Sequence, residues 1–332
     1  MKKLRWGVIG AGGIAHRRTL PVIGQTRNCV LSIVMDVCDP DKFGAKYGVD
    51  FTDSIEAVLS RDDVDAVYIA SPVHLHAEQA VAAAKTGKHV LCEKPLARTL
   101  AEARPMVEAC RDAGVLLREA YMLRYHGAHR EIARLIGNGA IGKPLFANVH
   151  WAFLYPKMEG AWRQIPELGG GGALADVGCH VFDLLRMFVG EIRRLAAVAG
   201  TLVQDYQVDD LTTVLLEFES GAQGSVTTSF AIPDGAMPPF VGIYGSTGSI
   251  EAVGTLTQGT GGEATLFADA DGQRRQIQYE QVNTYVRQLE AFADDVARGA
   301  KVEPGSEPEL LRAMAALEAA YTSARVGAFV AL

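Results

Sequence analysis

The stretch LRWGVIGAGGIA at residues 4–15 decides the fold of this chain. Its first half is an apolar run that ends at glycine, which is typical of a buried β-strand. A helical pattern begins at Ile14, directly after the glycines. Glycines at positions 10 and 12 and a small residue at position 15, between a strand and a helix, form the pattern of a dinucleotide-binding turn.

Each residue of this turn has a physical task. Gly10 permits the tight turn, Gly12 lets the backbone approach a pyrophosphate, and Ala15 lets the helix pack closely on the strand. The helix N-terminus adds free N–H groups and the positive end of its dipole. A glycine turn with a purely structural role is the alternative. The predicted cofactor contacts in this turn are Gly10, Gly12, Gly13, Ile14 and Ala15.

Asp36 ends the next β-rich run, residues 30–36, and stands 21 residues past Ala15. A carboxylate at this place accepts hydrogen bonds from the ribose hydroxyls of NAD. The same negative charge would repel the 2′-phosphate of NADP, and Val37 beside it supplies no arginine to hold that phosphate. The sequence therefore predicts NAD as the cofactor, with NADP as the less favoured alternative.

Outward from this turn, strand and helix signals alternate over the first 120 or so residues. Further β-rich runs occur at 66–71, 89–92 and 115–118, and residues 76–86 form an alanine-rich helical pattern. Such alternation indicates an α/β fold with a doubly wound parallel sheet. We therefore expect a Rossmann domain over residues 1–121.

The remaining residues, 122–332, have a different character. Helices are expected at 127–137, 174–188, 285–298 and 308–325, and strands at 145–153, 195–203, 212–218, 223–230 and 241–244. The last four strands follow one another without helices between them, which favours an antiparallel sheet. We expect one α+β domain here, with a large open, mostly antiparallel sheet.

Composition narrows the function classes. A chain of 332 residues with 48% apolar residues has enough material for two cores. Its net charge of −7 and the lack of a lysine–arginine run argue against nucleic acid or a membrane surface as a partner. No apolar stretch is long enough to cross a bilayer, and the first one is too short for a signal peptide. We expect a cytoplasmic protein whose five scattered cysteines are reduced and mostly buried, with no zinc site.

Two loops that follow the predicted parallel strands carry polar residues. Lys94, within Glu93-Lys94-Pro95, follows the strand at 89–92, and ligands bind at the carboxyl ends of such strands. A partly buried lysine there can donate a proton or polarise a substrate oxygen; a surface lysine is the alternative. The further cofactor contacts predicted at this edge are Ser71, Pro72, His76, Glu93 and Lys94.

A second group of residues begins with four glycines, residues 169–172, which allow close approach to a ligand. Asp176 and His180 follow on one helix, four residues apart and therefore on one face. Histidine is the usual general base near neutral pH, and a carboxylate raises its basicity. An ordinary surface pair or a core histidine is the first alternative, and a metal site formed with Asp183 is another.

Other polar residues are less informative. Trp162 and Arg163 precede the glycines, where the arginine can stack and hydrogen-bond a polyhydroxylated ligand or form a structural ion pair. His126 and His129 are expected to be solvated helix residues.

These residues together resemble a known family. The run SPVHLHAEQAVAAAKTGKHVLCEKPLA, residues 71–97, is similar to the signature of the glucose–fructose oxidoreductase and inositol dehydrogenase family, called Gfo/Idh/MocA. The segment WRQIPELGGGGALADVGCHVFDLL, residues 162–185, resembles its second signature, and residues 316–327 resemble its closing helix. The resemblance covers nearly the whole chain.

The resemblance implies a Rossmann domain, then an α+β domain whose open sheet mediates homodimers or homotetramers. It implies that Lys94, Asp176 and His180 form the catalytic set of a dehydrogenase that acts on CH–OH groups, with the nicotinamide near Lys94. The implied substrate is a sugar, a sugar derivative or a cyclic polyol. Because such substrates carry no charge, hydrogen bonds must select them, and the residues we expect to do so are Tyr121, Arg124, Trp162 and Arg163.

Two other functions stay open at this point. One is a glycosidase or lyase of the same family that uses NAD transiently and releases no net NADH. The other is a non-catalytic sensor that binds NAD and a partner protein; the presence of Lys94, Asp176 and His180 argues against it.

Overall fold

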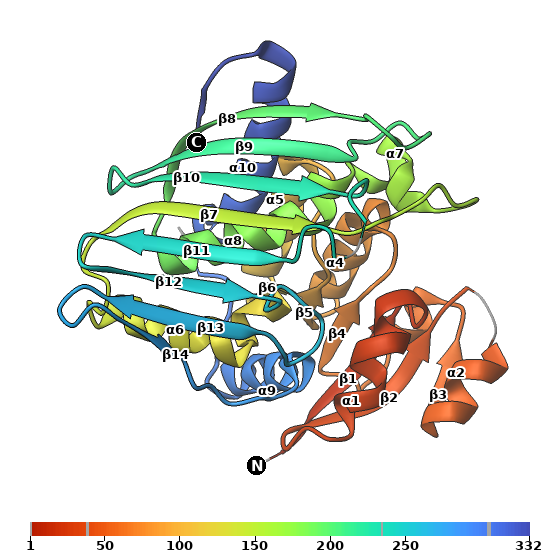
Figure 1. Ribbon diagram of the computed structural model, residues 1–332. Coiled ribbons are helices and arrows are strands. Elements are labelled where there is room, and N and C mark those ends of the chain that lie inside the picture. Colours follow the sequence, from red (N-terminus) through yellow and green to blue (C-terminus); the bar gives the residue numbers. More distant parts are fainter. Residues whose placement is uncertain (1, 38–39, 234, 304–306) are drawn as a thin grey trace. The chain divides into compact units, whose positions relative to one another are not determined.

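The computed structural model describes residues 2–37, 40–233, 235–303 and 307–332 (Figure 1). The chain forms two compact units. The first contains Met1–Ala120 and Tyr285–Arg312, and the second contains Tyr121–Thr284 and Ala313–Leu332. Residues 285–312, which the sequence places in the second domain, thus group with the first.

The core of the first unit explains this grouping. Helix α9 (Thr284–Ala297) places Leu289 and Phe292 in the same buried cluster as Trp6. The rings of Trp6 and Phe292 lie 5.1 Å apart, centroid to centroid. An apolar surface of the first unit is therefore covered by a segment that lies far along the chain.

The sheet of the first unit has six parallel strands in the order β3-β2-β1-β4-β5-β6, which confirms the predicted doubly wound sheet. Strands β1 and β4 are nearly or fully buried along their length, as expected for a sheet that is covered on both faces. The strands are β1 (Leu4–Ile9), β2 (Cys29–Met35), β3 (Asp50–Thr52), β4 (Ala66–Ile69), β5 (His89–Cys92) and β6 (Leu117–Glu119).

The helices of this unit connect the parallel strands, and α4 packs against α5 and β5. Two of them begin at side-chain caps, because Ser54 accepts a hydrogen bond from Ala57 N and Thr99 accepts one from Glu102 N. Besides α9, the helical segments are η1 (Ala15–Thr19), α1 (Leu20–Ile23), α2 (Pro40–Tyr47), α3 (Ile55–Leu59), η2 (Val73–Leu75), α4 (His76–Lys85) and α5 (Leu100–Asp112).

The sheet of the second unit has nine strands in the order β14-β13-β12-β11-β7-β10-β9-β8-β15. All neighbouring pairs are antiparallel except β7 and β10, so the expected mostly antiparallel sheet is confirmed. The strands are β7 (Pro144–Ala152), β8 (Ile192–Gly200), β9 (Leu211–Phe218), β10 (Gln223–Ser229), β11 (Phe240–Gly245), β12 (Gly248–Val253), β13 (Glu263–Ala268), β14 (Gln273–Gln276) and β15 (Val330–Ala331).

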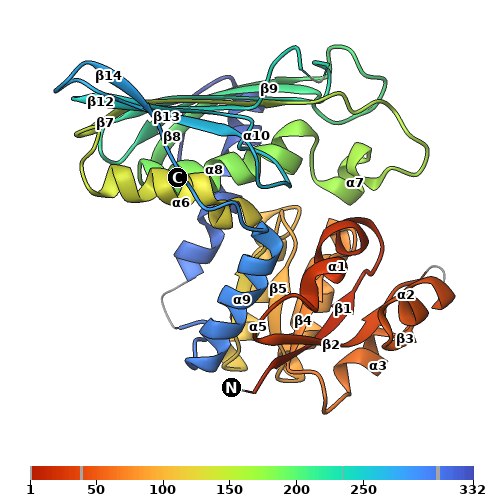
Figure 2. The same cartoon turned by 60° about the horizontal axis from the view of Figure 1, so that its bottom comes forward.

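Helices cover one face of this sheet and leave the other face open (Figure 2). The alternation along β9 shows the two faces. Val214 and Leu216 are buried on the covered face, whereas Leu215 between them is 54% exposed on the open face. The helical segments of the unit are η3 (Met122–Tyr125), α6 (Gly127–Gly137), η4 (Trp162–Gln164), α7 (Pro166–Gly169), η5 (Leu174–Gly178), α8 (Cys179–Phe188) and most of α10 (Glu307–Val326).

The sequence leads us to expect reduced, mostly buried cysteines and no membrane-spanning segment. Four cysteines are buried and carry no disulfide, namely Cys29, Cys92, Cys110 and Cys179, while Cys38 lies outside the described residues. Among the helices that the structure describes, none has both the length and the apolar character needed to cross a bilayer.

Candidate functional site

The glycine turn after β1 has the predicted strand–turn–helix geometry. Gly10 has a φ of +84°, and a Cβ on it would lie 2.5 Å from the backbone nitrogen of Ser71, so only glycine fits there. Gly13 has a φ of +50°, and no atom lies within 4 Å of where its Cβ would be. Gly12 N donates a hydrogen bond of 2.7 Å to Oδ2 of Asp36. The turn and the acidic residue therefore lie side by side at the carboxyl edge of the sheet.

This edge is also where the strand order reverses, between β1 and β4. In open α/β sheets the crevice outside such a reversal is the usual place of a bound ligand. Ser71 follows β4 here, and its hydroxyl donates to Oε1 of Gln79 at 2.6 Å. Gly10, Asp36 and Ser71, which follow β1, β2 and β4, thus lie at one edge of the sheet of the first unit.

Lys94 follows β5 at the same edge and is half-buried. Its backbone N–H donates to Oε2 of Glu93 at 3.3 Å. Glu93 is buried and accepts a short hydrogen bond from the hydroxyl of Tyr68 on β4. Burial, together with the charge of Glu93, raises the pKa of Tyr68 well above its ordinary value, so this hydroxyl keeps its proton and stays a donor.

His76 connects two loops of this edge. Its ring is buried, with Nε2 2.9 Å from the carbonyl oxygen of Ser71 and Nδ1 3.2 Å from that of Pro95. Burial lowers its pKa to about 4, although the neighbouring carbonyl groups oppose this shift. The neutral ring has one N–H and donates to one of these carbonyl oxygens, while it packs between the loop after β4 and the loop after β5.

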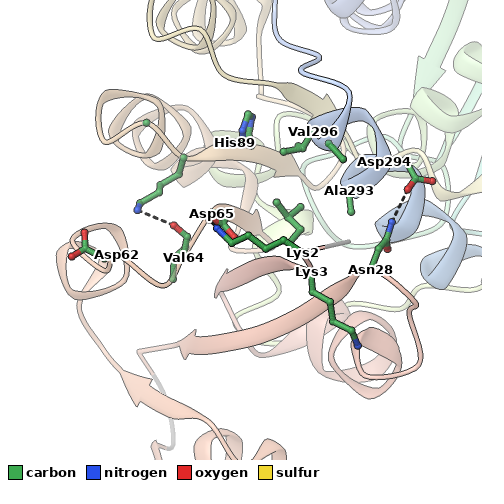
Figure 3. A pocket seen from close by; sticks show the side chains of 14 residues that line it. Lys2, Lys3, Asn28, Asp62, Val64, Asp65, His89, Ala293, Asp294 and Val296 are labelled. Atoms are coloured by element: carbon green, nitrogen blue, oxygen red, sulfur yellow. Dashed lines mark hydrogen bonds and ion pairs between the residues drawn. The ribbon is translucent and has the colours of Figure 1, made fainter.

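A pocket of about 600 Å³ opens at the opposite, amino edge of the same sheet (Figure 3). It is lined by residues at the starts of β1 and β5, including Leu4 and His89, and by Lys2 and Lys3. Asn28 on its wall donates to Oδ1 of Asp294 at 2.8 Å. This pocket shares no residue with the glycine turn or with Lys94, so it is separate from the candidate cofactor edge.

In the second unit, the predicted helix over residues 174–188 is present, with an unpredicted feature in its first turn. Residues 174–178, which include Asp176, form a π-turn, η5, and α8 with His180 follows directly. Such turns often occur at functional sites. His180 is 3% exposed and packs between two aromatic rings, with centroids 5.6 Å from Tyr121 and 5.9 Å from Trp151.

The two residues before the glycines contact the same turn. The guanidinium of Arg163 lies 4.2 Å from the ring centroid of Trp162 and its Nε lies 3.5 Å from Oδ1 of Asp176. Arg163 thus stacks on its neighbouring tryptophan and forms a structural ion pair with Asp176. Asp176 remains 20% exposed at its side chain.

Arg124 forms a bidentate pair with Asp183 of α8. Its Nε and Nη2 donate to the two carboxylate oxygens at 2.7 Å each. Burial opposes the charge of Arg124, but the hydrogen bonds and charge of Asp183 outweigh it and raise the pKa of the guanidinium. Through this pair, in which the Asp183 side chain is 3% exposed, η3 is joined to the helix that carries His180.

Sequence reasoning missed several of these contacts. Trp151 and Tyr68 each contact a predicted site residue, yet nothing in the spacing of the chain marks them. The expectation that His126 and His129 are solvated is wrong, because both are fully buried. His129 lies on the buried face of α6, where its Nδ1 is 2.9 Å from the carbonyl oxygen of Leu123.

Comparison with known families agrees with this architecture. Residues 4–121 match the family described as "Oxidoreductase family, NAD-binding Rossmann fold", and residues 129–251 match the "GFO/IDH/MocA C-terminal domain". The fold and the glycine turn thus define an oxidoreductase with a Rossmann unit that binds NAD or NADP. The chain belongs to the Gfo/Idh/MocA family, as its two signatures predicted.

Among curated relatives, this chain is 32% identical over 336 residues to D-xylose 1-dehydrogenase (NADP(+)) 2 of Haloferax volcanii, covering 99% of this chain and 100% of that protein. It is 35% identical over 300 residues to 1,5-anhydro-D-fructose reductase of Ensifer adhaerens, covering 87% and 86%. These relatives act on sugars, and the first is named for NADP.

Two solved structures are similar to this chain over nearly its whole length. The aldose–aldose oxidoreductase of Caulobacter crescentus, in complex with glycerol, superposes with a TM-score of 0.90 at 26% identity over all of both chains. Levoglucosan dehydrogenase, in complex with NADH and levoglucosan, gives a TM-score of 0.89 at 25% identity over 99% of both chains.

Proposed function

We propose that this protein is an NAD-dependent dehydrogenase that transfers a hydride between the nicotinamide and a secondary hydroxyl or keto carbon of a sugar, a sugar derivative or an inositol-like polyol. One observation supports it above the others. The glycine turn, Asp36 and Lys94 share the carboxyl edge of one parallel sheet, at its strand-order reversal. The relatives named for reactions on sugars supply the substrate class.

The residues present fit a dinucleotide. Gly10 and Gly13 keep the turn free of side chains, and the Asp36 carboxylate ends β2 beside Gly12. We propose NAD over NADP because the negative charge of Asp36 would face a 2′-phosphate, and because Val37, 80% exposed, offers that phosphate no cation. The proposed cofactor contacts are Gly10, Gly12, Gly13, Ile14, Ala15, Asp36, Ser71, Pro72, Glu93 and Lys94, with His76 holding the loops of Ser71 and Pro95 together.

The bound cofactor supplies hydride acceptance and donation, and the protein supplies position and proton transfer. In the direction of oxidation, His180 takes the proton from the substrate hydroxyl as the hydride leaves the same carbon. Lys94 hydrogen-bonds that oxygen and stabilises the charge that develops on it. Asp176, which pairs with Arg163, orients the histidine.

Sugar hydroxyls are recognised by hydrogen bonds and by stacking. Tyr121 packs against His180, the proposed general base, and Arg163, which stacks on Trp162, pairs with Asp176. Arg124 acts through its pair with Asp183. We propose Tyr121, Arg124, Trp162 and Arg163 as the residues that determine the sugar.

Absorbance at 340 nm tests this function. A panel of inositols, aldoses, glycosides and their keto forms is offered with NAD(H) and, in parallel, NADP(H). The wild type is compared with Lys94→Ala and with Lys88→Ala. Lys88 is a matched control because it flanks the same strand β5 at its other end, where Nζ donates to the carbonyl oxygens of Arg61 and Val64.

Turnover of one substrate class with NAD, reduced about 100-fold or more in Lys94→Ala and retained in Lys88→Ala, supports the proposal. NAD binding without net NADH from any substrate contradicts it. Cleavage of a glycoside in that second case identifies the glycosidase or lyase, and no turnover at all identifies the sensor.

The open face of the second sheet supports a further proposal, that copies of this chain associate there as a homodimer or homotetramer. The face carries exposed apolar residues on β8 and β9, with Val198 77% and Leu215 54% exposed, and the stacked pair Phe146 and Tyr244 on β7 and β11. Exposed apolar surface of this kind is typical of protein interfaces.

A further inference from the structure

The glycine run before α8 is tied to a buried carboxylate. Asp209, which lies just before β9, is 7% exposed. Its Oδ1 accepts hydrogen bonds from Gly172 N at 2.8 Å and from the hydroxyl of Tyr321 at 2.7 Å. Its Oδ2 accepts from Leu174 N at 2.9 Å and from the hydroxyl of Thr212 at 2.8 Å. Four neutral donors thus surround one carboxylate.

Asp209 and Tyr321 explain why positions 171 and 172 are glycine. A Cβ on Gly172 would lie 1.9 Å from the carbonyl oxygen of Asp209, and a Cβ on Gly171 would lie 2.0 Å from the hydroxyl oxygen of Tyr321. Real Cβ atoms do not approach other atoms so closely, so any larger residue would push the loop away. Gly171 and Gly172 are therefore fitted to Tyr321 and Asp209, rather than only to a ligand as the sequence indicated.

These contacts determine where the next helix begins. Gly172 O accepts a hydrogen bond of 2.9 Å from Asp176 N, and Ala173 N donates to Asp209 O at 2.9 Å. Asp209 thus holds three successive residues, 172–174, at the start of the π-turn that contains Asp176 and continues into the helix with His180. A shift at residue 172 would move both side chains together.

Tyr321 links this arrangement to α10. Burial and the charge of Asp209 raise the pKa of Tyr321 well above its ordinary value, so its hydroxyl remains a donor throughout the neutral range.

We propose that Asp209 and Tyr321 are positioning residues of the proposed reaction, acting through the glycine run to set the place of Asp176 and His180. The expected effect on kcat rests on the proposed function, whereas the expected effect on the place of His180 does not. Neither residue is proposed to touch substrate or cofactor.

The test compares two single-hydroxyl deletions on the same helix. Tyr321→Phe removes the donor to Asp209 and leaves three others in place. Ser323→Ala is the matched control: Ser323 is fully buried two residues further along α10, accepts from Ala197 N and donates to Ala328 O, and does not contact the glycine run. Urea denaturation checks that both variants fold with similar losses of stability.

Two readouts follow. In steady-state kinetics with saturating NAD, we expect Tyr321→Phe to lower kcat about 10- to 100-fold with a smaller change in KM, because small misplacements of catalytic groups affect mainly the chemical step. In protein with ¹³Cε1-labelled histidine, the His180 resonance, assigned among eight histidines with a His180→Gln sample, should move in Tyr321→Phe only. Asp209→Asn, which points an amide N–H at these donors, should show the same effects more strongly.

An unmoved His180 resonance in Tyr321→Phe, or equal effects of Tyr321→Phe and Ser323→Ala on resonance and kcat, would overturn the inference. If the wild type turns over no sugar while the resonance moves in Tyr321→Phe alone, the proposed function fails and the positioning role stands.

Discussion

At the scale of single residues, the proposed preference for NAD over NADP depends on Asp36. Replacing it by asparagine keeps an acceptor for Gly12 N and removes the negative charge. We expect the ratio of kcat/KM for NADP to that for NAD to rise about 10- to 100-fold, because a like-charge contact worth about 1.4–2.7 kcal/mol is removed. The measurement is initial rates with each cofactor at a saturating concentration of the same sugar.

Asp53→Asn is the control for this prediction, since it removes the same charge from the exposed residue just after β3. A ratio that stays constant in Asp36→Asn, or that rises equally in Asp53→Asn, would show that the charge at the end of β2 does not discriminate between the cofactors.

Gly172 provides a prediction for stability. Its Cβ would meet the backbone of Asp209 at 1.9 Å, so Gly172→Ala should destabilise the protein by about 2–4 kcal/mol. Gly137→Ala at the end of α6 is the control, because no atom lies within 4 Å of its Cβ position. There alanine should be neutral or stabilise by up to about 1 kcal/mol. Urea denaturation measures both, and equal stabilities would contradict the close approach.

At the scale of elements, the fold was largely predictable. The strand at 89–92 and the helix at 127–137 have the predicted bounds, because the first is a short apolar run and the second has one apolar stripe. Strand β14 was not predicted, since all four of its residues are exposed and it exists only by pairing with β13. Helix α5 was missed as well, and it contains Pro105.

The candidate site was predictable only in part. The glycine turn and the acidic residue after β2 have fixed spacings, so local sequence identifies them. The contacts that hold the site cross long stretches of chain: Asp209 and Tyr321 are 112 residues apart, and Arg124 and Asp183 are 59 apart. Periodicity within one element carries no information about such pairs.

The two buried histidines of α4 and α6 make stability depend on pH. Burial lowers the pKa of His76 to about 4 and that of His129 to about 3, whereas an unfolded histidine titrates near 6.5. The unfolded state therefore binds more protons below pH 6.5, and stability, fully present above that pH, is lost as the pH falls toward 4. Each histidine should contribute up to about 1.4 kcal/mol per pH unit.

Urea denaturation between pH 7.5 and pH 5 measures this slope. His76→Gln, which cannot bind a proton, should be less stable at pH 7.5 but should lose less stability on acidification than the wild type. A slope that is unchanged in this variant would show that His76 is not neutral in the folded protein.

At the scale of the whole molecule, the proposed homodimer or homotetramer depends on the open sheet face. Leu215→Arg places a charge on this face, midway along β9, and should dissociate the proposed oligomer into monomers, because an unpaired charge is costly to bury. Light scattering after size-exclusion chromatography measures the mass. Val30→Arg, a 41% exposed position on β2 of the first unit, is the control and should keep the oligomer. A monomeric wild type would contradict the proposal.

The way the chain passes between its units also governs how this protein can be recombined with its relatives. A chimera that exchanges everything after residue 120 would replace Phe292 and Leu289, and would pair the parent's Trp6 with another protein's helix. A chimera that exchanges residues 121–284 and 313–332 as two cassettes keeps each hydrophobic core from a single parent. Breakpoints at these three junctions are therefore the ones at which a new sugar specificity can be transplanted without rebuilding the nucleotide-binding unit.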